Sequence, residues 1–564
     1  MMRIASIHLL IIRLLLLLWE FGFAKADPVL SRKYFPSDFI FGAGTSAYQV
    51  EGAVAEDGRS PSIWDIATHS GPMLYEGNGD VAADQYHKFK EDVKLMADTS
   101  LDAYRMSISW SRLLPDGKEA ISPKGLKYYN NLINELTDHG IEPHVTLYHY
   151  DHPQVLEDEY GGWLSPKMVE DFTAFADICF REFGDRVSYW TTINEPNVFA
   201  VGAYDYGMFA PLRCSEPFGL INCTTGNSTV EPYIVVHHTL LAHASVAALY
   251  REKYLAKQHG KIGLNAYVVW ASPLTNSTAD ALAAQRAIDF YNGWIFDPIV
   301  FGDYPEIMKK NVGSRLPSFT EFQSKQIKGS FDFIGLNYYL TVYAQDSTNY
   351  PNSQGDFLMD MSVKLTSMYA FSFPYLGLLS PGFLLCILWC TTDQKFPLSW
   401  EKSVVFQLKR TRHHQARHFS DQFVPGVNLP SNPWGLEKVL DHIKQSYGNP
   451  PIFIQENGYG RLFNETLNDT ARVDFIAAHI NATLNAIRNG SNTRGYIIWS
   501  FLDVFEILPG PQRRYGLYHV DFEDCNRKRT PKYSARWFAN FLKGDVTESK
   551  IEEVKLEEVS RAQV

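Results

Sequence analysis

The sequence predicts an α/β protein built as a (β/α)8 TIM barrel in a single domain, and three observations lead to this fold class. Eight short apolar runs recur along the chain at intervals too long for β-hairpins. Stretches with helical spacing of apolar residues lie between the runs. Most runs are continuously apolar, which is typical of parallel strands buried on both faces. The length of 564 residues alone would suggest several domains, but barrels of this kind often exceed the usual domain size.

The apolar runs define the predicted strands, and each run ends in polar or aromatic residues. In chain order, the eight predicted strands are Phe39–Gly52, Ala103–Ser111, Pro143–Tyr150, Tyr189–Pro196, Lys261–Trp270, Phe331–Tyr339, Pro451–Gly458 and Tyr496–Asp503.

Four of the stretches between the runs are typical of helices. Asp84–Ser100 carries apolar residues at three- and four-residue spacing. Ser122–Gly140 begins with a serine that can cap a helix, continues with proline, and ends on a glycine suited to the position after a helix. Ser165–Gly184 and Thr470–Gly490 follow the same pattern.

Two glutamates stand in similar motifs at the ends of predicted strands. Glu195 lies in YWTTINEP and Glu456 in PIFIQENG, at the fourth and seventh predicted strands. In a (β/α)8 barrel, the loops after the strands build the active site. A pair of carboxylates, one protonated as an acid and the other ionised as a nucleophile or base, is what cleavage of a glycosidic bond requires. The alternative is that each glutamate caps a helix or pairs with an arginine.

Residues 1–26 are predicted to be a secretory signal peptide. They combine a basic residue at Arg3, an apolar run over Leu9–Trp19 and the small-residue cleavage pattern AKA. The barrel domain would then occupy residues 27–545, followed by a polar tail over 546–564. We expect the protein to enter the secretory pathway, to reach the cell exterior or the vacuole, and to be free of the membrane after removal of the signal.

Cysteines and glycosylation sequons agree with an oxidising compartment. Cys214 and Cys223 close a short loop and are predicted to form a disulfide. Cys179 lies in an apolar stretch and is expected to be a buried thiol. Seven Asn-x-Ser/Thr sequons are candidate glycosylation sites: Asn222, Asn227, Asn276, Asn464, Asn468, Asn481 and Asn489.

Charge and motifs point away from several other function classes. The formal net charge of −11 argues against nucleic acid as a partner. His149 and His152 suggest a metal site, but no further residue completes a familiar ligand set, so no metal is expected. The sequence has no phosphate-binding glycine loop, and it implies no cofactor. Its oligomeric state is not defined by these patterns.

Six motifs occur in an order that resembles glycoside hydrolase family one, the β-glucosidase family: QVEG, LYH, TTINEP, GLNYY, QENG and WSFLDVFE. The resemblance runs from about Lys33 to Leu542 and is strongest to plant members. It implies a retaining β-glucosidase that hydrolyses terminal, non-reducing β-D-glucosyl residues through a covalent glycosyl-enzyme. In that role Glu195 is the acid and base, Glu456 is the nucleophile, and the carboxyl groups lie about 5–5.5 Å apart.

The same resemblance implies the residues that hold the small-molecule β-glucoside. Asn194 matches the residue that donates to the sugar 2-hydroxyl. The others are Gln49, His149 and Glu506 on the remaining hydroxyls, Trp499 beneath the sugar, Tyr339 and Arg105 beside the nucleophile, and Asn337 in support.

Three positions near the sugar depart from the family pattern. Ile507 and Tyr150 stand where most members have tryptophan, and Val504 stands where most have asparagine. The loss of an indole at Ile507 predicts glycone binding weaker by about 1–3 kcal/mol. A transglucosidase that uses acyl-glucose or glycoside donors is therefore an alternative to the hydrolase, and an inactive, sugar-binding product is a third.

An atypical insert over residues 369–431 precedes the seventh predicted strand. Its first half is apolar without clean helical period, and its second half is basic, which is uncommon inside a compact domain. A membrane hairpin is one interpretation, but the barrel pattern continues afterwards. We favour the hypothesis of a retained intron that yields a catalytically impaired splice form. A dominant full-length transcript that encodes the insert would refute it.

Overall fold

The computed structural model describes residues 30–71, 77–347, 355–366, 431–462 and 466–544. The predicted signal peptide, the sequon at Asn464, residues 369–430 of the insert and the 546–564 tail lie outside the described residues.

Eight parallel strands close into the barrel that the sequence predicts. Each strand pairs with its neighbours around the ring, and the pairing of β1 with β10 and of β5 with β6 completes the closure. The barrel strands are β1 (Ile40–Gly44), β2 (Ala103–Ser107), β3 (Glu142–Tyr148), β4 (Tyr189–Ile193), β5 (Lys261–Pro273), β6 (Phe333–Asp346), β8 (Ile452–Asn457) and β10 (Thr493–Trp499).

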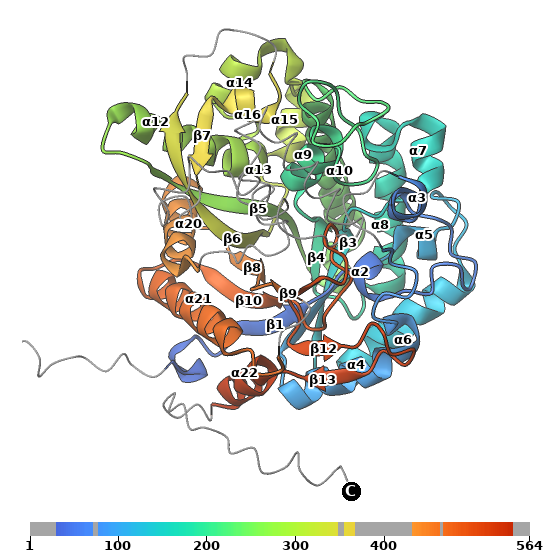
Figure 1. The fold of residues 1–564 in the computed structure, drawn as a ribbon. Coiled ribbons are helices and arrows are strands. Elements are labelled where there is room, and N and C mark those ends of the chain that lie inside the picture. Colours follow the sequence, from blue (N-terminus) through green and yellow to red (C-terminus); the bar gives the residue numbers. More distant parts are fainter. Residues whose placement is uncertain (1–29, 72–76, 348–354, 367–430, 463–465, 545–564) are drawn as a thin grey trace, which may run out of the picture.

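Helices surround the strands (Figure 1), and neighbouring helices contact one another around the barrel. The longer ones are α4 (Gln85–Thr99), α6 (Pro123–Asp138), α8 (Lys167–Phe183), α10 (Glu231–Lys253), α12 (Thr278–Ile288), α20 (Pro433–Ser446), α21 (Thr470–Arg488) and α22 (Tyr533–Lys543). Shorter helices are α2 (Ala47–Val50), α3 (Ile63–Ser70), α5 (Trp110–Leu113), α7 (Gln154–Tyr160), α9 (Pro196–Tyr204), α11 (Leu255–Gln258), α13 (Trp294–Phe301), α14 (Glu306–Val312), α15 (Glu321–Ile327) and α16 (Phe357–Met361).

Helix signals in the sequence correspond to the observed helix ends. The Ser122 side chain accepts a hydrogen bond from the Gly125 amide (3.1 Å), and Pro123 is the first residue of α6. Gly140 has a φ of +72°, the left-handed conformation that glycine adopts without strain.

Several small strands were not predicted. β7 (Val363–Thr366) pairs antiparallel with the outer part of β6, which extends well past the predicted strand end. β9 (Arg461–Leu462) pairs with β11 (Arg513–Arg514), and β12 (Tyr518–Val520) pairs with β13 (Arg529–Pro531). Each of these strands is too short to carry a readable period, and the pairing of β9 with β11 also joins segments far apart in the chain.

Aromatic rings close the amino-terminal end of the barrel interior. His144 stacks on Tyr189 with ring centroids 4.5 Å apart, and Phe453 lies 5.0 Å from Tyr189 and 5.3 Å from Phe333. These rings come from β3, β4, β8 and β6, so contacts between non-adjacent strands must cross the interior. Because Gly263 faces the Phe333 ring with no room for a Cβ, the packing here is tight. Side chains therefore fill the barrel interior at the amino-terminal ends of its strands, and a pocket can open at the carboxyl ends.

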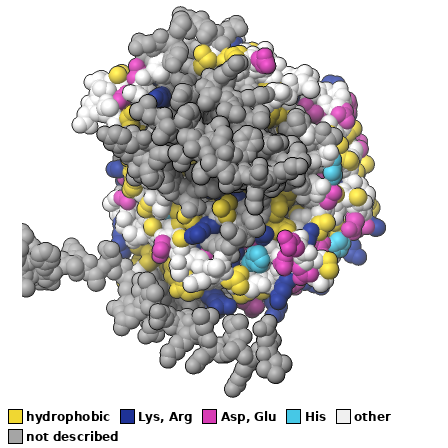
Figure 2. All heavy atoms as spheres, viewed as in Figure 1, with side chains coloured by type: hydrophobic (Ala, Val, Ile, Leu, Met, Phe, Trp, Pro, Cys, Tyr) yellow, Lys and Arg dark blue, Asp and Glu magenta, His cyan; other side chains and the backbone are white. Residues whose placement is uncertain are grey.

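The predicted disulfide joins Cys214 and Cys223, and Cys179 is a buried thiol as predicted. The six sequon asparagines in the described residues are all exposed, namely Asn222, Asn227, Asn276, Asn468, Asn481 and Asn489. Acidic and basic side chains lie interspersed over the described surface in Figure 2. Among the described helices, α10 is long and apolar enough to cross a membrane, but 67% of its most apolar stretch is buried inside the protein.

Candidate active site

The two glutamates lie at the carboxyl ends of the fourth and seventh barrel strands, β4 and β8, as predicted. β4 ends at Ile193, and Glu195 occupies the N-cap position of α9 with a φ of +40°, without a side-chain hydrogen bond to that helix end. Pro196 follows at the first helical position, so the chain turns sharply immediately after the carboxylate. This turn places Glu195 at the rim of the barrel interior, with only 7% of its surface exposed.

A bulge in β8 directs Glu456 into the barrel. Leu336 of β6 pairs with Ile454, but the next residue, Asn337, pairs with Glu456, so Gln455 is an extra residue. Side chains normally alternate across a strand, and an extra residue changes the face to which later side chains point. As a result, both Gln455 and Glu456 hydrogen-bond to side chains of other barrel strands.

Glu456 is held by one charged and one neutral donor. The Arg105 guanidinium donates to its Oε1 (2.5 Å), and the Tyr339 hydroxyl donates to its Oε2 (2.7 Å). Arg105 also donates to Asn194 Oδ1 (2.7 Å), and it is 1% exposed. A buried arginine beside a buried carboxylate stabilises the ionised form of that carboxylate.

Glu195 receives two uncharged donors instead. Asn337 Nδ2 donates to its Oε1 (2.6 Å), and the Tyr150 hydroxyl donates to its Oε2. Burial, assisted by the nearby Glu456 charge, raises the pKa of Glu195 to about 8, although the two donors oppose that rise. Glu195 is therefore expected to be protonated at neutral and mildly acidic pH.

Beneath the carboxylates lies a layer of buried amides. Asn265 Nδ2 donates to Asn337 Oδ1 and to Gln455 Oε1, both at 2.7 Å. Gln455 Nε2 donates in turn to Thr191 Oγ1 (2.7 Å). This network connects β4, β5, β6 and β8 and fixes the side chains on which the carboxylates rest.

A second polar group lies on the opposite side of the pocket, around Glu506. Gln49 Nε2 donates to Glu506 Oε2 (3.3 Å), and Trp499 Nε1 donates to Glu506 Oε1 (3.2 Å). Removal from water is the main cause that raises the pKa of Glu506 to about 8. His149 stacks on Trp499 with rings 5.9 Å apart, and burial keeps its pKa well below the usual value, so the imidazole is neutral.

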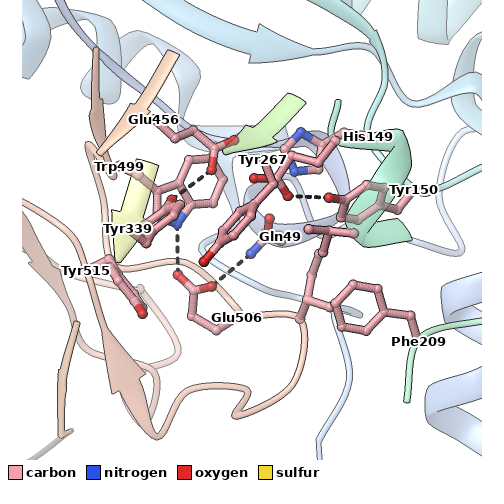
Figure 3. A pocket seen from close by; sticks show the side chains of 13 residues that line it. Gln49, His149, Tyr150, Phe209, Tyr267, Tyr339, Glu456, Trp499, Glu506 and Tyr515 are labelled. Carbon is pink, nitrogen blue, oxygen red and sulfur yellow. Dashed lines mark hydrogen bonds between the residues drawn. The ribbon is translucent and has the colours of Figure 1, made fainter. Parts of the chain in front are cut away.

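These groups surround one pocket at the carboxyl end of the barrel (Figure 3). Seven predicted site residues line it, namely Gln49, His149, Glu195, Tyr339, Glu456, Trp499 and Glu506. Arg105, Asn194 and Asn337 lie against the two carboxylates through the hydrogen bonds above. Of the three departures, Tyr150 and Ile507 line the pocket, whereas Val504 is fully buried.

Four lining residues were not predicted as site residues: Val198, Phe209, Tyr267 and Tyr515. Val198 lies on α9 and Phe209 shortly after it, both in the segment that follows β4 and Glu195. Tyr267 stacks on Tyr339 with ring centroids 6.1 Å apart. Of these four, only Tyr267 could have been predicted from the sequence. It lies within a predicted strand, two residues after Asn265, and so shares the interior face of the barrel with that residue.

His152, the second half of the metal interpretation, points away from His149. Its Nδ1 lies 3.0 Å from the Tyr148 hydroxyl and its Nε2 lies 3.2 Å from Glu157. Within the described ranges, no group of three or more His, Cys, Asp or Glu side chains is placed to hold a metal ion.

A closed (β/α)8 barrel whose mouth brings together two differently held glutamates, amides and aromatic rings has the form of a glycoside hydrolase. Comparison with known proteins makes the assignment specific. The chain belongs to Glycosyl hydrolase family 1, whose family model matches residues 31–546.

Relatives and solved structures agree with this family. The chain is 52% identical over 535 residues to Beta-glucosidase 22 of Oryza sativa subsp. japonica, covering 94% of this chain and 91% of the relative. It is also 52% identical over 516 residues to the Cyanidin 3-O-glucoside 7-O-glucosyltransferase (acyl-glucose) of Delphinium grandiflorum, covering 91% and 90%. A crystal structure of a rice β-glucosidase superposes with a TM-score of 0.78 at 39% identity, covering 92% of this chain and 100% of that chain.

Proposed function

We propose that this glycosyl hydrolase cleaves terminal, non-reducing β-D-glucosyl residues with retention of configuration, with Glu456 as nucleophile and Glu195 as acid and base. The contrast between the partners of the two carboxylates is the observation that carries the proposal. Glu456 is paired with a guanidinium, whereas Glu195 is buried with a raised pKa. The family and its β-glucosidase relatives supply the substrate class.

The first step forms the glycosyl-enzyme. A Glu456 oxygen attacks the anomeric carbon while Glu195 gives its proton to the departing glycosidic oxygen. Arg105 and Tyr339 each donate to one oxygen of Glu456. These two hydrogen bonds fix the rotamer of the nucleophile and the direction of its attacking oxygen. Asn194 accepts a hydrogen bond from Arg105, which orients its side chain, and its proposed role is to donate to the sugar 2-hydroxyl.

The second step releases the sugar. Ionised Glu195 takes a proton from water as the water oxygen bonds to the anomeric carbon, from the face that the aglycone left, and the bond to Glu456 breaks. Glu506, Gln49 and Trp499 form the polar and flat surface proposed to hold the sugar ring during both steps. No metal or organic cofactor is required by this sequence of steps.

A second candidate is transfer of glucose to an acceptor other than water. Two observations favour it: the glucosyltransferase relative at 52% identity, and the Tyr150 and Ile507 departures in the pocket. Hydrolase and transferase share the glycosyl-enzyme and differ only in what reaches it. Product partitioning with an added alcohol separates the two activities.

The direct test of the proposed function is the anomer released first. Turnover of an activated aryl β-glucoside at mildly acidic pH should give β-glucose in the earliest proton NMR spectra, followed by mutarotation. Release of α-glucose first would exclude retention. Absence of turnover with aryl, alkyl and acyl β-glucosides would contradict the proposed function as a whole.

We further propose that residues 1–26 are removed as a signal peptide, that residues 27–545 form the catalytic domain, and that the protein enters the secretory pathway. The disulfide and the exposed sequon asparagines support this. A full-length fusion expressed in plant cells should gain mass that endoglycosidase removes. A protein of unmodified mass in the cytosol would refute the proposal, and the location of the fusion would separate cell exterior from vacuole.

A further inference from the structure

We infer that Tyr150 controls leaving-group specificity: it holds the acid proton of Glu195 and so favours glucosyl donors whose leaving group departs with little protonation. The chemical class is the glucose ester of a carboxylic acid, and activated aryl glucosides share the property. The inference rests on the proposed function, because it assumes that Glu195 is the acid and Glu456 the nucleophile. It adds a positioning residue and a donor class that those roles alone do not require.

Both oxygens of Glu195 already have partners within the protein. Asn337 Nδ2 lies 2.6 Å from Oε1, and the Tyr150 hydroxyl bonds to Oε2. Glu195 and Tyr150 are 7% and 2% exposed, so both contacts are shielded from solvent. Figure 3 shows the Tyr150 ring with its hydroxyl directed into the pocket, and the dashed line from that hydroxyl marks its hydrogen bond to Glu195.

The hydrogen-bond network determines which oxygen carries the acid proton. Arg105 can only donate, so the Asn194 atom that it meets at 2.7 Å is the carbonyl oxygen. Asn337 approaches that same oxygen at 3.2 Å and must therefore present its NH2 group there. The same NH2 group donates to Glu195 Oε1. Because an N–H cannot accept a proton, neutral Glu195 carries its proton on Oε2, the oxygen that Tyr150 contacts.

Tyr150 is held firmly in this position. It lies two residues after the end of β3 with a φ of +71°, and its ring stacks on Phe199 with centroids 5.2 Å apart and planes 13° apart. The Phe209 ring also contacts it, with its centroid 5.9 Å from that of Tyr150. Burial and the adjacent Glu195 keep the pKa of Tyr150 well above its usual value, so the hydroxyl keeps its proton. A hydroxyl both donates and accepts, and it can therefore bind Oε2 in either protonation state of Glu195.

This geometry creates a competition for one proton. An alkyl glucoside needs the Oε2 proton on its glycosidic oxygen, so the Tyr150 contact must be given up as the C–O bond breaks. A glucose ester does not need it: Glu456 bonds to the anomeric carbon, the C–O bond breaks, and the electron pair leaves with the carboxylate. Glu195 then loses its proton to solvent, which balances the released carboxylate, and Tyr150 donates to ionised Glu195 and steadies it as a base.

The second step restores the protonated form of Glu195. Ionised Glu195 takes the proton of the acceptor hydroxyl as that oxygen bonds to the anomeric carbon and the bond to Glu456 breaks. This proton returns Glu195 to the neutral form in which the cycle began. A tryptophan at position 150 would present an indole N–H, which can donate but cannot accept the acid proton.

The charged and titratable groups around Glu195 come from several barrel strands. They are Arg105 on β2, Tyr150 and neutral His149 after β3, Tyr267 on β5, Tyr339 on β6 and Glu456 on β8. Removal of the Tyr150 hydroxyl leaves this set of charges unchanged and deletes one donor to the anion. The pKa of Glu195 should then rise, because a donor to the ionised form lowers a carboxyl pKa.

The test compares Tyr150→Phe and Tyr150→Trp with the wild-type chain. The kcat/KM values are measured for methyl β-glucoside, 4-nitrophenyl β-glucoside and 1-O-benzoyl-β-glucose. Both variants should raise the methyl-to-benzoyl ratio by about tenfold, and Tyr150→Phe should move the basic limb of the methyl glucoside pH profile upward. Tyr204→Phe, which removes the hydroxyl of another buried tyrosine that does not line the pocket, should leave the ratio unchanged.

The outcomes separate the two proposals. Wild-type turnover with an unchanged ratio in both variants overturns the role of Tyr150 and leaves the proposed function intact. No wild-type turnover of any donor overturns both. If a variant lacks activity, the pKa of Glu195 is measured instead by infrared titration. The Glu195 carboxyl band is isolated by subtracting the spectrum of Glu195→Gln. An unchanged Glu195 pKa in Tyr150→Phe would again overturn the inference.

Discussion

The two sides of the pocket contrast in how each holds its glutamate. On one side, Glu456 meets the Arg105 guanidinium and the Tyr339 hydroxyl. On the other, Glu195 meets only the uncharged donors Tyr150 and Asn337. Their exposures are nearly equal, 5% and 7%. Burial therefore does not distinguish the two carboxyls, and the charge of the hydrogen-bond partner does.

The charge of the hydrogen-bond partner can fit one residue type to the two chemical roles proposed for Glu456 and Glu195. A direct cation favours the ionised form needed for attack, whereas burial with neutral donors leaves the proton in place for donation. Substitutions that remove or exchange the partners of each side should therefore have separable kinetic signatures.

Glu456→Gln should abolish the nucleophile and lower kcat/KM by more than about 10⁴-fold for every β-glucoside, activated or not. The amide keeps the shape of the side chain, so circular dichroism should match the wild type. Steady-state assays with alkyl, aryl and acyl donors measure the loss. Retention of full activity toward any one donor would show that another group attacks the anomeric carbon.

Glu195→Gln should show selective loss instead. Turnover of an alkyl glucoside should fall by about 10²–10⁴-fold, because the departing alkoxide then leaves unprotonated. Formation of the glycosyl-enzyme from an activated aryl donor should change far less and is measured as a pre-steady-state burst of phenol. Equal losses for both donors would indicate that Glu195 serves binding and not proton transfer.

The pH profile should report the raised pKa of Glu195. Since the acid must be protonated and its pKa is about 8, kcat/KM for an alkyl glucoside should hold below that pH and fall above it. The pH dependence of an acyl donor, which needs no proton, should lack this fall in glycosyl-enzyme formation. A basic limb centred near the ordinary glutamate pKa would contradict the assignment.

Arg105→Lys should lower kcat/KM by about 10²-fold. An ammonium cannot reproduce the fork that reaches both Glu456 and Asn194, so positioning is lost while the charge is kept. Arg529→Lys is the matched control, because Arg529 forms a buried ion pair with Asp92 (2.7 Å) away from the pocket. That control should lose stability but keep kcat/KM in its folded fraction. A comparable kinetic loss in the control would assign the Arg105 effect to folding.

Ile507→Trp should have the smallest effect on activity, a fall in KM for glucosides of about tenfold, because an indole adds a stacking face and a donor at the pocket wall. Ile507 is one of the lining residues, on the same side as Glu506. Ile507→Leu serves as the control for changed packing without a donor. Equal KM values in all three forms would show that this wall does not contact the sugar.

Much of this contrast was readable from the sequence. The strand runs placed Glu195 and Glu456 on the fourth and seventh strands, and the barrel brings both into one pocket. Parallel strands are buried on both faces, so each one is visible in the sequence as a continuous apolar run. The family motifs also supplied Arg105 and Tyr339, which do bond to Glu456.

The rest depends on contacts that no local pattern encodes. Phe209 and Tyr515 reach the pocket from irregular loops, where side-chain direction follows no period. The extra residue Gln455 in β8 is visible only from pairing with β6. The sequence marked Tyr150 as a departure from the family, but its bond to Glu195 depends on a left-handed residue after β3 and a ring stack on Phe199.

The most direct test of the contrast between the two glutamates is azide rescue of paired alanine variants with an activated aryl β-glucoside. Azide that replaces the Glu456 carboxylate should attack the substrate itself, so Glu456→Ala should yield α-glucosyl azide. Azide that replaces the base should attack the glycosyl-enzyme, so Glu195→Ala should yield β-glucosyl azide. Proton NMR of the isolated azides distinguishes the anomers. The same anomer from both variants, or the reverse assignment, would contradict the account.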